Sequence, residues 1–113
     1  MIERLITIGR LGDLIERANE FVEPSHAMYC LYVPESQQSS LHENMECGLM
    51  LFLTEDDDDF VPDEAKERNW VNVSDIRMMQ DVLDVAHMVH EHPTQDYLVK
   101  ALAYYMHNDA FMQ

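Results

Sequence analysis

The sequence predicts an α+β domain in which helices pack on one face of a small, mostly antiparallel sheet of about three strands. Two apolar runs, residues 27–33 and 48–54, are short and bounded by polar or charged residues, as strands are. Two longer segments, residues 75–91 and 95–107, repeat apolar residues at helical spacing. Because 47% of the 113 residues are apolar, the chain can bury one core, and we expect a single domain over residues 1–113.

The first element is expected to be a helix that Thr7 caps and that runs to about residue 21. Its apolar residues recur at helical spacing, although Gly9 and Gly12 lower the helix propensity of its first turns. Residues 27–33 follow as a strand that is apolar on both faces and rich in β-forming residues. After a polar loop, residues 48–54 form the second expected strand.

The middle of the chain predicts a short helix and a third strand. Pro62 suits the first position of a helix over about residues 62–68, because a proline there removes no helical hydrogen bond. Residues 70–73 are expected as a strand that begins at Trp70. We interpret Trp70 as a core residue, with an aromatic anchor at an interface as the alternative.

The last two elements are expected to be helices. Ser74 is the expected N-cap of a helix over residues 75–91, with Asp75 in its first turn. Thr94 is the expected cap of the last helix, residues 95–107. The inward stripe of the longer helix is predicted to contain Ile76, Met79, Leu83, Ala86 and Val89 or His90. The predicted element order is therefore α-β-β-α-β-α-α.

Charge is the strongest feature of the composition. Asp and Glu number 22 against 7 Lys and Arg, a formal net charge of −15. Such a surface repels phosphate backbones and anionic membranes, and it attracts a basic protein. We therefore expect no direct nucleic-acid binding and no membrane association. No stretch is long and apolar enough to span a bilayer, and the N-terminus lacks a signal-peptide pattern, so we expect a cytoplasmic location.

An acidic block follows the second expected strand. Eight acids lie within the thirteen residues 55–67, and like charges held together cost the fold free energy. The block lacks the glycine and the alternating ligands of a calcium loop. A solvated loop is the alternative to a docking surface for Lys and Arg. The candidate partner-binding residues are Glu55, Asp56, Asp57, Asp58, Asp59, Phe60, Asp63, Glu64, Asp81 and Asp84.

Metal binding and catalysis find little support in the sequence. His87, His90 and His92 are close in sequence, with Glu91 or His107 as further ligands, but they do not form a recognised zinc motif. No Gly-x-Ser-x-Gly motif and no glycine-rich phosphate loop occurs. We therefore predict no enzyme activity, no catalytic residue, no metal site and no cofactor.

The two cysteines, Cys30 and Cys47, each adjoin an apolar run. Nothing in their spacing requires a disulfide. We expect both to be buried, reduced and unreactive thiols.

Two stretches of the sequence resemble a family of small bacterial proteins. One is the C-terminal stretch that ends in Tyr104-Tyr105-Met106-His107-Asn108-Asp109-Ala110-Phe111, and the other is residues 73–82. Many members end in a similar Tyr-Tyr-x-x-Asn-Asp-Ala-Phe tail, and they look like immunity proteins of contact-dependent growth inhibition and related toxin systems. The resemblance implies a shared fold and no catalytic residues. Because immunity proteins diverge where they meet their toxins, it does not carry over binding residues.

Composition and resemblance together favour one functional hypothesis. The chain is expected to bind and neutralise a cationic toxin domain, a nuclease in the first instance, at the C-terminus of a large secreted protein. The alternatives are a nucleic-acid mimic that inhibits a DNA-binding defence protein, and an acidic adaptor without an inhibitory role. A toxin gene immediately upstream would favour the first hypothesis. The sequence does not define the oligomeric state.

Overall fold

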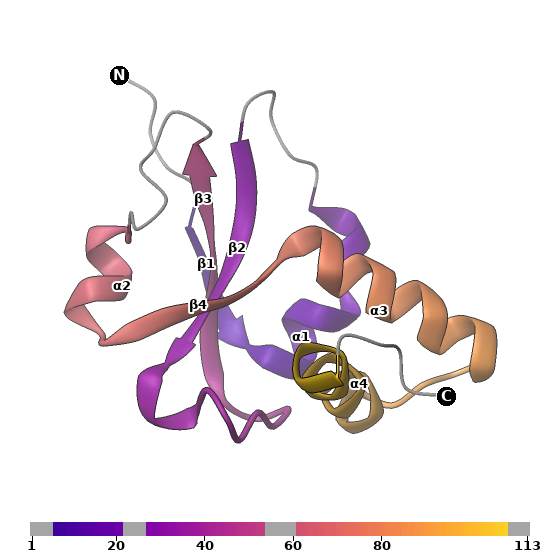
Figure 1. Ribbon diagram of the computed structural model, residues 1–113. Coiled ribbons are helices and arrows are strands. Elements are labelled where there is room, and N and C mark those ends of the chain that lie inside the picture. The colour runs from indigo at the N-terminus through magenta and orange to yellow at the C-terminus, as the bar shows by residue number, and fades with distance from the viewer. Residues whose placement is uncertain (1–5, 22–26, 54–60, 109–113) are drawn as a thin grey trace.

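The fold is an antiparallel four-stranded sheet with helices on it, which confirms the predicted α+β class (Figure 1). A computed structural model describes residues 6–21, 27–53 and 61–108. The order of the strands in the sheet is β1-β3-β2-β4, and each neighbouring pair is antiparallel. The strands are β1 (Ile6–Arg10), β2 (Ala27–Pro34), β3 (Glu46–Leu53) and β4 (Trp70–Asp75).

Helices cover both faces of this sheet. They are α1 (Leu11–Glu16), α2 (Asp63–Glu67), α3 (Ile76–Val89) and α4 (Gln95–Asn108), with short 3-10 turns at Ala18–Glu20 and Glu35–Gln37. Figure 1 shows α1, α3 and α4 on one side of the sheet and α2 on the other. The expectation that all helices pack on one face is therefore wrong for α2. The reason is visible in β2, whose two faces are both apolar, so the second face also needs a cover.

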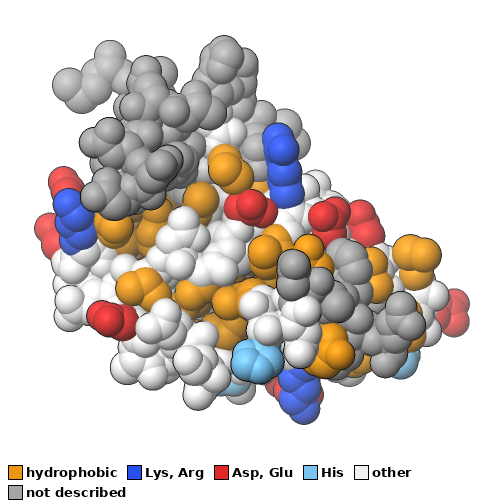
Figure 2. Space-filling view, in the orientation of Figure 1, with side chains coloured by type: hydrophobic (Ala, Val, Ile, Leu, Met, Phe, Trp, Pro, Cys, Tyr) orange, Lys and Arg blue, Asp and Glu red, His pale blue; other side chains and the backbone are white. Residues whose placement is uncertain are grey.

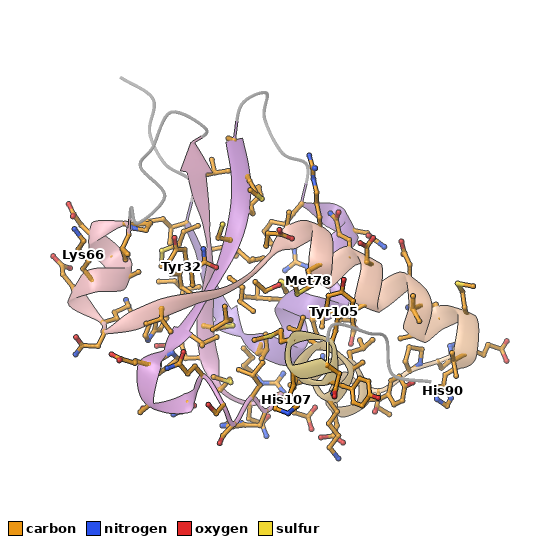
Figure 3. All side chains as sticks on the ribbon, in the orientation of Figure 1. Tyr32, Lys66, Met78, His90, Tyr105 and His107 are labelled. Atoms are coloured by element: carbon orange, nitrogen blue, oxygen red, sulfur yellow. The ribbon has the colours of Figure 1, made fainter. Side chains whose placement is uncertain are left out.

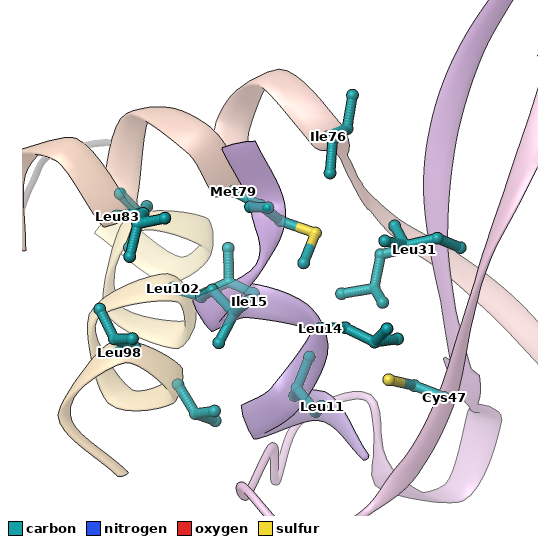
Figure 4. Close-up of a cluster of buried hydrophobic side chains, with 14 of the residues drawn as sticks. Leu11, Leu14, Ile15, Leu31, Cys47, Ile76, Met79, Leu83, Leu98 and Leu102 are labelled. Atoms are coloured by element: carbon teal, nitrogen blue, oxygen red, sulfur yellow. The ribbon is translucent and has the colours of Figure 1, made fainter. Parts of the chain in front are cut away.

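The main core lies between the sheet and helices α1, α3 and α4 (Figure 4). Leu31 and Leu49 reach it from the sheet, and Ile15, Met79 and Leu102 reach it from the three helices. All five side chains are fully buried. Burying large aliphatic side chains is the main favourable term in folding, at roughly 1.5–3 kcal/mol for each.

The first element differs from the prediction. Residues 6–10 form strand β1, whose register pairs Ile6 with Met50 and Arg10 with Glu46. The helix begins only at Leu11, where the backbone amide of Leu11 donates to the carbonyl of Met45 over 2.9 Å. The β-branched run Ile-Thr-Ile prefers the strand, and pairing with β3 satisfies its backbone groups.

Gly12 lowers the helix propensity of α1, but it is needed for packing. It is buried in α1 against the first turn of α4, and a Cβ at this position would lie 3.1 Å from the Cβ of Gln95. The side-chain amide of Gln95 donates to Asp13 over 3.0 Å at the same contact. Glycine therefore permits the close approach of α1 and α4 that the sequence pattern does not reveal.

Of the two predicted helix caps, one is confirmed and one is wrong. Thr94 caps α4 as predicted, because its hydroxyl accepts from the amide of Tyr97 over 3.1 Å. Asp75, and not Ser74, caps α3: its carboxylate accepts from the amide of Met78 over 2.8 Å. Strand β4 runs on to Asp75 and keeps Ser74 buried within it.

The inward stripe of α3 is confirmed for most of its length. Ile76, Met79, Leu83 and Ala86 are buried as predicted, whereas α3 ends at Val89, which is exposed. Helices α3 and α4 have 14 residues each. In the described ranges no helix is long and apolar enough to cross a bilayer.

Candidate partner-binding surface

Helix α2 is the element on which the predicted acidic site can be examined directly. Its first turn contains Asp63 and Glu64, and its last turn contains Lys66. Ala65 is fully buried in a second hydrophobic cluster with Tyr32, Met50 and Trp70. Figure 3 shows Tyr32 pointing from the sheet toward α2, while Lys66 projects from the outer side of the helix. The small side chain of Ala65 thus lets a helix of only five residues sit close to the sheet.

Arg68 fastens α2 to two strands. Its guanidinium donates to Glu64 of α2, with an Nη2–Oε1 distance of 3.0 Å, and lies 3.4 Å from the carboxylate of Glu46 in β3. The same group stacks on the Trp70 ring, with its Cζ atom 5.0 Å from the ring centroid. The Arg68 side chain remains 38% exposed, so each ion pair contributes at most about 1 kcal/mol. Its main effect is to fix where α2 ends.

Asn69 makes the turn from α2 into β4. Its φ of 57° lies in the left-handed region, which asparagine tolerates better than most residues. The carbonyl of Asn69 accepts from the amide of Glu35 over 3.0 Å. This sharp turn brings the ring of Trp70, the first residue of β4, against the Arg68 guanidinium.

Gly48 provides the space for Trp70. A Cβ at Gly48 would lie 3.1 Å from the Trp70 ring and 3.1 Å from the terminal methyl of Met50. The interpretation of Trp70 as a core residue agrees with its burial, since only 6% of it is exposed. Trp70 therefore packs between the sheet and the Arg68 guanidinium.

The structure does not bring the predicted site residues together on one surface. Asp63 and Glu64 lie on α2, whereas Asp81 and Asp84 lie exposed on α3, which packs on the opposite face of the sheet. Figure 2 shows carboxylates around α2 at the left and along α3 at the right, with mostly apolar and uncharged side chains between them. Glu55, Asp56, Asp57, Asp58, Asp59 and Phe60 lie outside the described residues.

The basic side chains of the described ranges form mainly local ion pairs. Arg10 binds Asp13, Arg17 binds Glu20 and Lys100 binds Asp96, in each case three or four residues apart. Arg68 binds Glu46 and Glu64. These pairs use few of the acids, so the excess of carboxylates stays on the surface.

The three histidines that are close in sequence have separate surroundings. His90 (Figure 3) packs edge-on against the Tyr97 ring, with the ring centroids 4.5 Å apart. His87 and His92 are exposed. Within residues 6–21, 27–53 and 61–108, no group of three His, Cys, Asp or Glu side chains is placed to hold a metal ion.

A groove of about 660 Å³ lies between residues 38–41 and the end of α4. Leu41, Ala103, Tyr104 and Met106 give it an apolar lining. None of the residues that line it is an acid, so this groove is separate from the acidic surfaces.

Both cysteines are buried, as predicted, but they lie on different faces of the sheet. Cys30 belongs to the cluster under α2, and Cys47 belongs to the main core. Burial, with a smaller contribution from the charge of Glu46, raises the pKa of the Cys47 thiol to about 12. The Cys47 thiol donates to the carbonyl of Gly9, with an Sγ–O distance of 3.6 Å. A thiol in this state is a poor nucleophile.

We expect neither thiol to react rapidly in the folded protein. Because both side chains are buried, labelling by a chromogenic disulfide reagent at pH 8 should be at least about a hundred-fold slower than in urea-unfolded protein. Stopped-flow absorbance would measure this ratio. Fast labelling of both cysteines before unfolding would contradict the burial of the two thiols.

The apolar residues of β1 are not among the site residues that the sequence predicts. Ile6 and Ile8 are 41% and 37% exposed, and they extend the face of the sheet that α2 covers elsewhere. The β-branched run was their only sequence signal, and the helical spacing of the residues that follow concealed it.

Comparison with known families places the chain in one of them. Residues 7–113 match the model of a domain of unknown function, DUF7716. The chain belongs to this family. The match spans all the described elements except the first residue of β1. A search of curated proteins and a search of solved structures gave no match.

Proposed function

We propose that this DUF7716 protein is an immunity protein, which binds a basic toxin domain through the acidic surface at the α2 end of the sheet. The charge of the chain supports this proposal. Eight acids against Lys66 alone give residues 55–67 a formal net charge of −7, about half of the total of −15. A nuclease domain is the expected partner, because it must present basic residues to hold phosphates.

The observation that carries the proposal is the anchoring of α2. Ala65 is buried against the sheet, and Arg68 ties the end of α2 to β3 and β4. Asp63 and Glu67 remain exposed on the same helix. The acidic segment 55–59 joins the end of β3, at Leu53, to this anchored helix. The described residues on either side of the segment, Leu53 and Val61, thus belong to a fixed platform, which lowers the entropic cost of binding a partner there.

The local ion pairs add a second support. Each local ion pair is close to neutral overall, so the unpaired acids set the negative potential further from the surface. A field of one sign raises the rate at which an oppositely charged protein is captured, by about 10–10³-fold at low ionic strength. Fast capture suits an inhibitor that must act before a toxin does.

The test compares two variants with the same change of charge. Asp56, Asp57, Asp58 and Asp59 are changed together to Asn in the first. The matched control changes Glu16→Gln, Glu20→Gln, Glu91→Gln and Asp96→Asn, four exposed acids outside the predicted partner-binding residues. Each variant is mixed with the domain encoded immediately upstream of this gene, and surface plasmon resonance measures the rate of association.

We expect the first variant to associate at least about ten-fold more slowly than wild type at low salt. The association rate of the control should fall much less. At 1 M salt the difference should largely vanish, because the Debye length falls to about 3 Å. An equal fall in association rate in both variants would show that the rate depends only on the total charge of the protein. An unchanged rate for the first variant would make segment 55–59 a solvated loop. Binding only to a DNA-binding protein would instead favour the nucleic-acid mimic.

A further inference from the structure

The two edges of the sheet are protected to different degrees. An edge strand presents unpaired backbone groups to which another strand can add, and proteins protect such edges with bulges, charges or a covering element. Strand β4 has two of these devices. A register shift between Leu31 and Tyr32 interrupts its pairing with β2, and α2 packs against it.

Among the described residues, little protects strand β1, the other edge of the sheet. In the described part of the chain its principal partners are β3 and the α1 helix that follows it. Its first four residues, Ile-Thr-Ile-Gly, include no charged residue and no proline. Arg10 is the charged residue at the end of β1, and its guanidinium donates to Asp13 and Asn44.

The register shows which backbone groups of β1 point outward. The amide of Leu11 donates to the carbonyl of Met45, so the pair that continues the β1–β3 ladder is hydrogen-bonded. In an antiparallel ladder such pairs alternate with non-bonded ones. Thr7 and Gly9 therefore bond to β3, whereas the amide and carbonyl groups of Ile8 and the amide of Arg10 face away from the sheet.

The side chains beside this edge are apolar and accessible. Ile6 pairs with Met50 and Ile8 pairs with Gly48, so both lie on the face of the sheet where Trp70 and Met50 are buried. An added strand would extend this face and cover both isoleucines. Ile6 also lies at the end of the sheet where β3 finishes, since its partner Met50 is only three residues before Leu53. In the sequence, the acidic segment 55–59 follows Leu53 after one residue.

We infer that the edge of β1 receives an extended segment of the basic partner, which adds to the sheet as a fifth strand. This inference rests on the proposed function and specifies how the partner docks. Charge determines the occupant. A second copy of this chain would place one net charge of −15 beside another, whereas a basic strand would lie near Leu53, which the acidic segment follows in the sequence. Backbone hydrogen bonds would then hold a partner that the acids attract.

The test removes one outward amide without touching the β1–β3 ladder. Ile8→Pro eliminates the N–H that a fifth strand would use, and an edge strand tolerates proline where the amide faces outward. Ile8→Ala is the matched control, because it removes the side chain and keeps the amide. With the domain encoded immediately upstream as the probe, we expect Ile8→Pro to raise the Kd at least about ten-fold above that of Ile8→Ala. Thermal melting of both variants shows whether they fold.

Amide hydrogen exchange of the wild-type protein gives a second readout, independent of any substitution. The amides of Ile8 and Arg10 should exchange quickly in the free protein and at least about ten-fold more slowly in the complex. Equal Kd values for the folded Ile8→Pro and Ile8→Ala variants, or unchanged exchange at both amides, would overturn strand addition while leaving the proposed function intact. Absence of wild-type binding would defeat the proposed function itself, and strand addition with it. A dimer at high salt that Ile8→Pro abolishes would assign the edge to a second copy instead.

Discussion

Replacing Trp70 by alanine should lower the free energy of unfolding by about 3–5 kcal/mol, the usual cost of removing a buried aromatic side chain. The Trp70 ring fills the space next to Gly48, and the Arg68 guanidinium stacks on the ring. Without the ring, Ala65 of α2 also loses part of the surface on which it packs. We therefore expect the second hydrophobic cluster to open and α2 to lose its fixed position.

Urea unfolding followed by circular dichroism would measure the loss, with two control variants. Trp70→Phe keeps an aromatic ring and should cost clearly less than alanine. Arg68→Gln removes both ion pairs and the stacking but keeps Trp70, so it should cost only about 1 kcal/mol, because the ion pairs are exposed. If Arg68→Gln lowered the free energy of unfolding as much as Trp70→Ala, the contacts of Arg68 rather than the buried Trp70 ring would hold α2 in place.

Much of this fold can be predicted from short-range pattern. Strands β2 and β3 were predicted because their apolar runs are short and bounded by polar residues. Helices α3 and α4 were predicted because Ile76, Met79 and Leu98, Leu102 recur at helical spacing. These signals are local, so they do not depend on where the rest of the chain lies.

Strand β1 could not be predicted in the same way, because its stability comes from a distant partner. Ile6 pairs with Met50, far along the chain, and no local pattern encodes that pairing. The helical spacing that begins at Leu11 conceals the strand character of the residues just before it. The cap of α3 was misplaced for a related reason: Ser74 is a good cap by residue type, but β4 continues through it.

The candidate site was predicted in composition but not in arrangement. The density of acids in residues 55–67 is evident from the sequence. That Asp81 and Asp84 lie across the sheet from Asp63 depends on α2 crossing to the second face. The contacts of Arg68 with Glu46 and Trp70 depend on the tertiary packing of α2, β3 and β4, so they have no signature in the sequence.

The buried thiol of Cys47 should make the protein lose stability at alkaline pH. Its pKa is raised in the folded state to about 12 from an ordinary value of 9.0, because the core desolvates the thiolate. Above pH 9 the unfolded chain therefore releases a proton that the folded chain retains, and unfolding becomes more favourable. The stabilising effect is complete below about pH 9 and is lost as the pH rises toward 12. Each pH unit in this window should cost about 1.4 kcal/mol.

Two variants isolate this effect from the titration of tyrosines and lysines. Cys47→Val keeps an apolar side chain of similar size, and Cys47→Ala leaves a small cavity; neither titrates. Both should be less stable than wild type at pH 8 by a constant packing cost. Between pH 9 and pH 11, urea unfolding should show wild type losing about 2–3 kcal/mol more than either variant, so that the gap narrows or reverses. Parallel curves for all three proteins would mean that the Cys47 thiolate is accommodated in the folded core.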